Sequence, residues 1–311
     1  MKDFLHSWKV RTGLAILCLY GLFAIFGPGL DALLGLDPHA IDYTAIQQPP
    51  STAHWLGTTT GGEDVLAQLL VGTRGSITVG LIAGTISTAI AVLVGVIGTF
   101  AGGHADGFAN FLTNLFLVVP VFPLILVVAG YLQGGGVLMI GLLIGFFGWP
   151  GGARTLRAQT LSLRRRDFIM AMRMLGERRW RLVWVEAMPH LAGWISAMFL
   201  HAVVGAVLAE AGLAFLGITS PDAVSWGTMI QQANQQSALL RGMWWWFVPP
   251  GACIALLGLA AGLVNFGIDE IANPRLKAAR RSLVRQVDRR TGAAARPGPT
   301  PAAPRTQEVP S

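Results

Sequence analysis

The sequence predicts an all-α polytopic membrane protein with six transmembrane helices and a long cytoplasmic loop between the fourth and the fifth. Three observations support this fold class. Hydrophobic residues make up 53% of the 311 residues and charged residues 13%, whereas a soluble domain has about 25% charged residues. Six apolar segments approach or exceed the ~20 residues that a helix needs to cross a bilayer. Basic residues cluster beside these segments, which is typical of membrane topology and not of a nucleic-acid-binding protein.

Each apolar segment is read as one membrane span. The segments are 10–30, 76–101, 108–132, 136–153, 191–218 and 244–268. Residues 133–135 separate the third from the fourth, and we expect a tight hairpin there. Pro120 and Pro123 each remove a backbone hydrogen bond from the third segment and favour a kink. Gly80 and Gly84 form a G-x-x-x-G pair that either packs against a helix or matches by chance.

The positions of Lys and Arg predict the orientation. If the N-terminal arm 1–9 is cytoplasmic, six spans place the loop 154–190 and the tail 275–311 on the same side. The N-terminal end, this loop and this tail together carry 21 of the 23 Lys and Arg residues, as the positive-inside rule requires. We therefore expect a multi-pass membrane protein with both termini cytoplasmic and an extracytoplasmic loop 31–75. The tail is rich in Pro, Ala and Arg, and we expect it to be largely disordered.

The cytoplasmic loop 154–190 contains the signals of a short helix. Asp167 is suited to cap its N-terminus and Gly176 to end it. The residues between them, 168–175, form about two turns, ~12 Å long. The helix therefore lies outside the spans, with its own start and stop.

The short helix carries an apolar ridge. Phe168, Met172 and Leu175 share one face at spacings i, i+4 and i+7. An apolar ridge outside the bilayer docks either on the membrane surface or in a groove of another protein. The alternative is a solvated basic linker without a partner.

The spacing of this loop resembles the EAA loop of bacterial ABC importer permeases. That pattern is E-A-A, three residues, Gly, nine residues and then I-x-L-P. Gly176 and Pro189 stand at the required separation. Met170, Ala171 and Met172 occupy the E-A-A positions, so the acidic residue of the pattern is missing.

Further motifs resemble those of the dipeptide/oligopeptide/nickel permeases, and their order is similar to that of the C-type subunit. The resemblance covers residues 8–277. The matching stretches are H-W-L-G-T-T-T-G-G-E-D-V from His54, E-A-G-L-A-F-L-G from Glu210, S-W-G from Ser225 and N-P-R-L from Asn273. By resemblance the loop 31–75 covers the transport path, where Glu63 and Asp64 either meet basic groups of a binding protein or stay solvated.

The resemblance implies the transmembrane permease subunit of an ATP-driven ABC importer, which forms half of the path for peptides. Its implied partners are a homologous B-type permease, two cytoplasmic ABC ATPases, an extracytoplasmic substrate-binding protein and membrane lipid. We expect no catalytic residue, cofactor, metal site or nucleic-acid partner for this chain. It lacks the G-x-x-x-x-G-K-[ST] sequence of a P-loop, so ATP and Mg are expected on the ATPases.

The resemblance also assigns candidate residues. The ATPase-coupling loop comprises Asp167, Phe168, Ile169, Met170, Ala171, Met172, Arg173, Leu175, Gly176 and Pro189. Glu210 and Trp226 are candidates for the pathway or an outer gate. Glu210 lies ~29 Å along the fifth segment, near the outer face, so the other interpretation is an interfacial residue hydrogen-bonded to a neighbouring helix or loop.

Other functions stay open at this point. The same machinery in related proteins imports nickel chelates or oligosaccharides. A self-contained secondary transporter is a further alternative, but such proteins use intramembrane acids and bases, often in internal repeats. A membrane enzyme would need a clustered catalytic set, and none stands out in the sequence.

Overall fold

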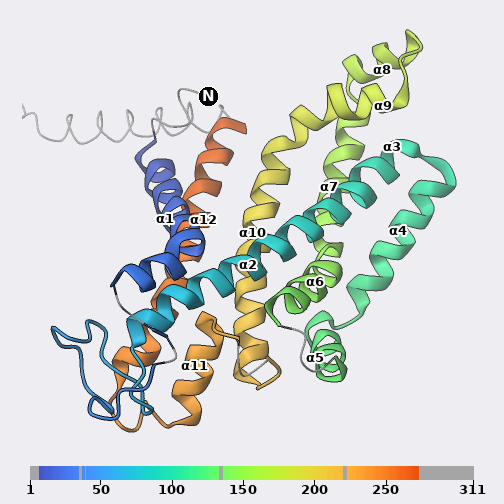
Figure 1. Cartoon of the computed structure of the whole chain (residues 1–311). Coiled ribbons are helices and arrows are strands. Elements are labelled where there is room, and N and C mark those ends of the chain that lie inside the picture. Colours follow the sequence, from blue (N-terminus) through green and yellow to red (C-terminus); the bar gives the residue numbers. More distant parts are fainter. Residues whose placement is uncertain (1–6, 35–36, 39, 133–135, 220–222, 273–311) are drawn as a thin grey trace, which may run out of the picture. The chain divides into compact units, whose positions relative to one another are not determined.

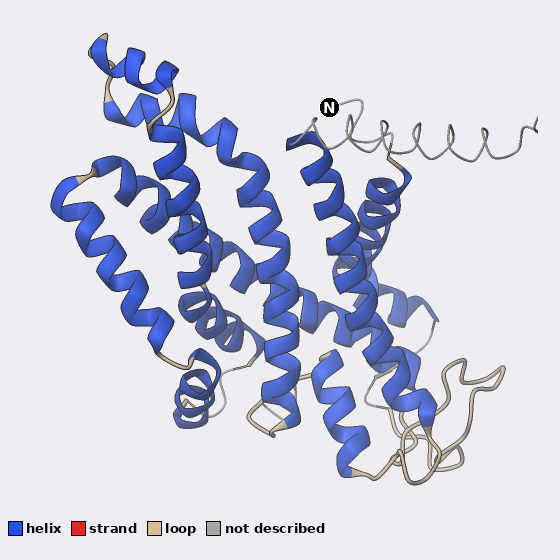
Figure 2. Cartoon of the chain, turned by 180° about the vertical axis from the view of Figure 1, so that it is seen from behind, coloured by secondary structure: helices blue, strands red, loops and turns tan. Residues whose placement is uncertain are grey.

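The computed structural model is mainly helical in the part of the chain that it describes, with its longest non-helical stretch at residues 40–64 (Figure 2). The described residues are 7–34, 37–38, 40–132, 136–219 and 223–272. The chain divides into two compact units, Met1–Ile268 and Asp269–Ser311. The expected hairpin at 133–135 and the tail 275–311 lie outside the described residues.

The first two spans are longer than the sequence predicts. Helix α1 covers Trp8–Leu34, and α2 covers Val65–Val92. A π-helical segment, Leu93–Gly98, and α3, Thr99–Ala101, continue α2 without a break. The resulting 37-residue helix is ~55 Å long, more than the ~30 Å hydrocarbon core, and it crosses its neighbours obliquely (Figure 1).

A bend divides the third segment into two helices, which confirms the kink expected at Pro120. Helices α4, Gly103–Val118, and α5, Val121–Tyr131, meet at 80°. Val119 and Pro120 are extended between them, because proline disfavours a helical residue before it and has no N–H to continue the ladder. Pro123 lies in the first turn of α5, where a missing N–H is tolerated.

The fourth segment also continues beyond its predicted end. Helices α6, Val137–Gly148, and α7, Pro150–Arg164, meet at 41° beside Trp149. Among the described residues, four helices are long and apolar enough to cross a membrane, and the number rises to six if each bent pair is one span. This range confirms the predicted all-α polytopic membrane fold.

The second half of the chain contains the remaining helices. They are α8, Asp167–Met174; α9, Arg179–Arg181; the π-helical segment Leu182–Ala187; α10, Met188–Phe215; α11, Trp226–Gln235; and α12, Trp244–Ala272. Helix α11 was absent from the sequence prediction because its polar composition does not resemble a membrane span. The start of α1, the end of the Trp244–Ile268 span and α8 lie at one end of the first unit (Figure 1).

Helix α2 forms the centre of the unit and packs against α1, α6 and α10. The G-x-x-x-G pair is a packing face and not a chance match. A Cβ atom on Gly80 would lie 3.0 Å from the side chains of Val203 and Val207, and one on Gly84 would lie 2.7 Å from Val203. The two glycines therefore let α2 and α10 approach closely where lipid supplies no hydrophobic drive.

Candidate functional site

The turn after α8 has the hydrogen bonds of a Schellman motif. The N–H of Gly176 donates to the carbonyl of Arg173 at 3.1 Å, and the N–H of Glu177 donates to the carbonyl of Met172 at 3.1 Å. Gly176 has φ +79°, a conformation that glycine adopts without strain. The prediction that Gly176 ends this helix is confirmed.

The start of α8 differs from the prediction. Asp167 is the first residue of the helix, and Arg166 is the N-cap, without a side-chain capping bond. The carbonyl of Arg166 accepts the N–H groups of Ile169 and Met170, both at 3.1 Å. The prediction that Asp167 caps the helix is therefore wrong. A negative charge in the first turn still interacts favourably with the helix dipole.

The faces of α8 also differ from the predicted ridge. Phe168 and Met172 pack against the chain's own core, around a fully buried Ile169. The exposed apolar side chains are Met174, 86% exposed, and Leu175, 79% exposed. The three residues therefore do not form one exposed ridge. Phe168 and Met172 fix the helix to the core, whereas Leu175 faces outward.

A second exposed methionine completes the free side of α8. Met170 is 44% exposed and lies one turn before Met174. Sequence reasoning missed Met174, although its i, i+4 spacing from Met170 was visible. Met170, Met174 and Leu175 form what we call the α8 contact face, an apolar surface that the described chain leaves uncovered.

Pro189 has a structural role in the helix that follows. Helical structure runs without a break over Arg179–Phe215, so the predicted loop 154–190 is helical at both ends and non-helical only near α8. The π-helical segment Leu182–Ala187 immediately precedes Met188 and Pro189. Proline cannot donate the regular helical bond, and a π-turn is one way to accommodate such a defect.

The motifs that begin at Glu210 and Ser225 meet in a buried cluster at the other end of α10. The hydroxyl of Ser225 donates to Oε1 of Glu210 at 2.6 Å and accepts the N–H of Thr228 at 3.1 Å. Ser225 and Thr228 form a capping box at the start of α11. Glu210 is 2% exposed, and no donor among the described residues reaches its Oε2.

Trp226 extends this cluster to two more helices. Its backbone N–H donates to Ser76 Oγ at 3.0 Å, and its indole Nε1 donates to Thr73 Oγ1 at 3.2 Å. Tyr20 packs edge-on against the indole at 5.3 Å. We call the cluster of Glu210, Ser225, Trp226 and Thr228 the α10–α11 junction.

The geometry of the junction bears on the two interpretations of Glu210. Trp226 is fully buried, as is Ser225, and Glu210 is bonded to a neighbouring helix cap. This arrangement supports the hydrogen-bonded structural role of Glu210 and gives Trp226 no open path to line. The capping box at Ser225 and Thr228 was missed, although the spacing alone could have predicted a helix start.

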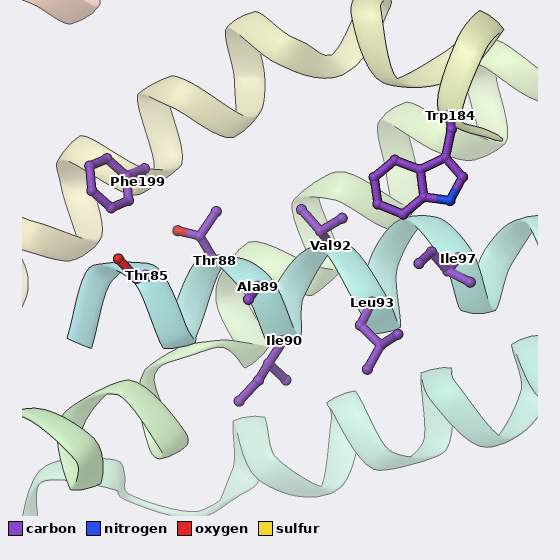
Figure 3. Close-up of a pocket in the computed structure, with 9 residues that line it drawn as sticks. All are labelled: Thr85, Thr88, Ala89, Ile90, Val92, Leu93, Ile97, Trp184 and Phe199. Carbon is purple, nitrogen blue, oxygen red and sulfur yellow. The ribbon is translucent and has the colours of Figure 1, made fainter. Parts of the chain in front are cut away.

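An apolar groove of about 620 Å³ lies between the α2 helix and α10, with Phe199 and Trp184 on one side (Figure 3). The remaining lining residues are Thr85, Thr88, Ala89, Ile90, Val92, Leu93 and Ile97. Thr88 Oγ1 is buried without a partner among the described residues. The groove is thus mainly apolar, with two threonine hydroxyls at one end.

The loop before α2 satisfies its acidic residues internally. Asp64 caps α2 by accepting two backbone N–H groups of its first turn, and it also contacts His54 Nδ1 at 2.8 Å. Glu63 accepts from Thr59 and from Gln68, each at 3.0 Å. Asp64 is therefore a capping residue, and the expectation that this pair is free for a binding protein is not supported.

The outward surface of the same loop has a different character. The hydroxyl and the backbone N–H of Thr44 donate to Asp42, which lowers the pKa of that carboxyl below its usual value. Tyr43 and Trp55 are largely exposed. The loop therefore presents a charged carboxylate and aromatic side chains on its surface.

Comparison with known proteins matches residues 55–278 to the family model described as "Binding-protein-dependent transport system inner membrane component". The chain is 34% identical over 286 residues to the oligopeptide transport system permease protein OppC of Mycobacterium tuberculosis and of Mycobacterium bovis. That alignment covers 91% of this chain and 96% of each relative. The chain is also 32% identical over 266 residues to the probable D,D-dipeptide transport system permease protein DdpC of Escherichia coli. That alignment covers 85% of this chain and 87% of the relative.

Proposed function

Because the chain belongs to the binding-protein-dependent transport system inner membrane component family, we propose that it is the C-type permease subunit of an ATP-driven peptide importer. The observation that carries the proposal is the α8 contact face. Exposed apolar side chains stand on a short helix that a Schellman turn and a buried Ile169 hold in place. Such a helix is built to fit a groove in another protein.

The partner that fits α8 is a cytoplasmic ATPase. Two ATPases bind ATP and Mg and hydrolyse ATP, while this chain carries no P-loop sequence. The contact face on α8 transmits their closure, and Phe168 and Met172, which pack against the core, make the helix move together with it. The helix Arg179–Phe215 then carries the movement from α8 toward the outer end.

The apolar groove is the surface that fits half of a transport path. A path for peptides of varied sequence must bind each of them weakly, and a wall of aliphatic side chains with two threonines meets that need. His201 lies near the middle of the Arg179–Phe215 helix with an exposed side chain. Because a polar residue is costly in lipid, the side of α10 that carries His201, which is opposite the groove-lining Phe199, also meets either protein or water, and a homologous B-type permease supplies the other half of the path.

Peptides are the substrate class that the named relatives favour. Those relatives are named as oligopeptide and D,D-dipeptide permeases. An extracytoplasmic binding protein delivers the substrate, and the surface around Asp42, Tyr43 and Trp55 is suited to meet it. The start of α1, the end of the last span and α8 lie at one end of the unit (Figure 1), which supports an inner-membrane orientation with both termini cytoplasmic.

The proposal is tested on α8. We expect the tagged full chain to co-purify from its native membrane with an ATPase that contains a Walker sequence. The double variant Met170→Ser/Met174→Ser should lose most of this ATPase because the apolar contact is removed. Leu240→Ser is the matched control, since Leu240 is 89% exposed but lies between α11 and α12. Equal ATPase recovery with the double variant and the parent chain would contradict the proposal.

A further inference from the structure

A small polar cavity of about 270 Å³ lies where α3, α7, α8 and α9 come together. Its basic lining residues are Arg164 at the end of α7, Arg173 on α8 and Arg179 on α9. Phe100, Ala101, Glu177 and Leu182 complete the lining. Three guanidinium groups from three different elements therefore converge on one cavity.

Two of the three arginines are held in position by the backbone. Arg164 donates to the carbonyl of Thr99 and lies 6.0 Å from the ring centroid of Phe100. Arg179 donates from Nη1 to the carbonyl of Ala101 at 3.1 Å. A guanidinium group has five N–H donors, so each retains further donors for a ligand. The site is thus preorganised in part before any ligand arrives.

The three guanidinium charges in this cavity are only partly balanced by nearby carboxylates, of which Asp106 acts on Arg164. Glu177 is the acidic residue of the lining, and it is paired with Arg181 at 3.0 Å. Asp106, at the start of α4, is bound by two nitrogens of Arg157 at 3.0 Å each. Like charges that converge without counter-charge are unfavourable. The cavity is therefore best stabilised by an added anion.

The residues around the cavity indicate that it lies at the depth of the lipid headgroups. Trp180 lies in α9, at the start of the helix that runs from Arg179, and is 59% exposed. Indole rings prefer the membrane interface. Phe100, over whose ring Arg164 lies at 6.0 Å from the centroid, and Leu182 form the apolar wall of the cavity. A phosphate that continues into an apolar portion matches such a wall better than a free ion does.

We propose that this cavity binds the phosphate of an anionic phospholipid in the cytoplasmic leaflet. Arginine recognises phosphate by paired, charge-assisted hydrogen bonds, and basic pockets beside cytoplasmic helix ends bind anionic headgroups. The bound headgroup bridges α7, α8 and α9. It therefore holds residues 167–181, which comprise α8, its turn and α9 and which we call the α8 hairpin, at a fixed angle to the core. The inference rests on the proposed cytoplasmic position of α8, but its test needs no transport activity.

The test measures lipid binding to the purified full chain by native mass spectrometry after delipidation. Phosphatidylglycerol is the probe, with phosphatidylcholine and inorganic phosphate as the comparison ligands. We expect Arg173→Gln/Arg179→Gln to weaken phosphatidylglycerol binding about tenfold, since two charge-assisted contacts are lost. Arg165→Gln/Arg178→Gln is the matched control, because it removes the same charge from the same segment outside the cavity lining. We expect the control to stay within about twofold of the parent.

Several results would overturn the proposal. Equal weakening in both double variants would mean that general charge attraction, and not the cavity, binds the lipid. Equal retention of phosphatidylcholine, or competition by millimolar phosphate, would exclude a specific phospholipid headgroup. Loss of the bound lipid when the ATPase joins the complex would assign the arginines to acidic residues of that protein.

A second measurement guards against a folding defect in the variant. In the parent chain, phosphatidylglycerol nanodiscs should slow hydrogen exchange over α8 and α9 compared with phosphatidylcholine nanodiscs. Unchanged exchange between the two lipids would also overturn the proposal. Failure of ATPase co-purification would leave these lipid measurements unaffected, so the two proposals can fail separately.

Discussion

The α8 hairpin and the α10–α11 junction are built in opposite ways, although both match motifs in the sequence. The hairpin leaves Met174 and Leu175 almost fully exposed. The junction buries Glu210, Ser225 and Trp226 and joins them by hydrogen bonds. A motif therefore does not reveal whether its side chains serve a partner or the chain itself, and burial separates the two uses.

One continuous helix connects the two regions. Helical structure runs over Arg179–Phe215, from just after the hairpin to just beyond Glu210. It spans ~55 Å, and the π-helical segment Leu182–Ala187 is its irregular part. In the proposed importer, the exposed end receives force and the buried end passes it to α11.

The largest expected effect on stability lies within the α8 hairpin, where the buried Ile169 is compared with the exposed α8 contact face. Ile169→Ala removes a fully buried side chain and should cost about 3 kcal/mol of local stability. Met174→Ala changes an 86% exposed side chain and should cost less than about 0.5 kcal/mol. Hydrogen exchange of α8 in the full chain measures both. Similar exchange rates in the two variants would show that α8 has no distinct anchored side.

At the junction, Gly227 tests how tightly α11 is packed on α10. A Cβ on this residue would lie 2.6 Å from the Cα of Ala211 and 3.1 Å from Glu210 Oε2. Gly227→Ala should therefore cost about 2–3 kcal/mol by overpacking, measured as thermal unfolding in detergent. Gly205→Ala on α10 is the control, because no atom lies within 4 Å of that Cβ position. A destabilisation by Gly205→Ala as large as that by Gly227→Ala would contradict close packing at the junction.

The sequence predicted the spans well where hydrophobicity alone decides the structure. It placed the helix end at Gly176 because a left-handed residue after a helix favours glycine. The prediction that Phe168 and Met172 are exposed for a partner was wrong. Helical periodicity groups residues on one face but does not show which face meets the core. It also missed α11, whose polar residues have no span signal, and the convergence of Arg164, Arg173 and Arg179, which depends on tertiary structure.

The hydroxyl of Ser225 tests the polar part of the junction. Ser225→Ala removes a helix cap and leaves the buried Glu210 without its donor, and it should cost about 2 kcal/mol. Asn234→Ala, on the exposed last turn of α11, should change stability by less than about 0.5 kcal/mol. Thermal unfolding of the full chain separates them. If Ser225→Ala unfolds at the parent temperature, Glu210 is not held by this bond.

The smallest expected change in stability is at Gly176, where the effect on transport should nevertheless be large. Its Cβ position is open, so a substitution acts through backbone strain at φ +79°, which costs about 1–2 kcal/mol for most residues. Gly176→Val should distort the turn and uncouple ATP hydrolysis from peptide uptake, whereas Gly176→Asn should retain uptake because asparagine tolerates this conformation. Both rates are measured in vesicles that contain the whole complex. Parent-level uptake by the Val variant would show that the angle of α8 does not control coupling. The exposed hairpin would then transmit no movement and, like the buried junction, would serve only the chain's own structure.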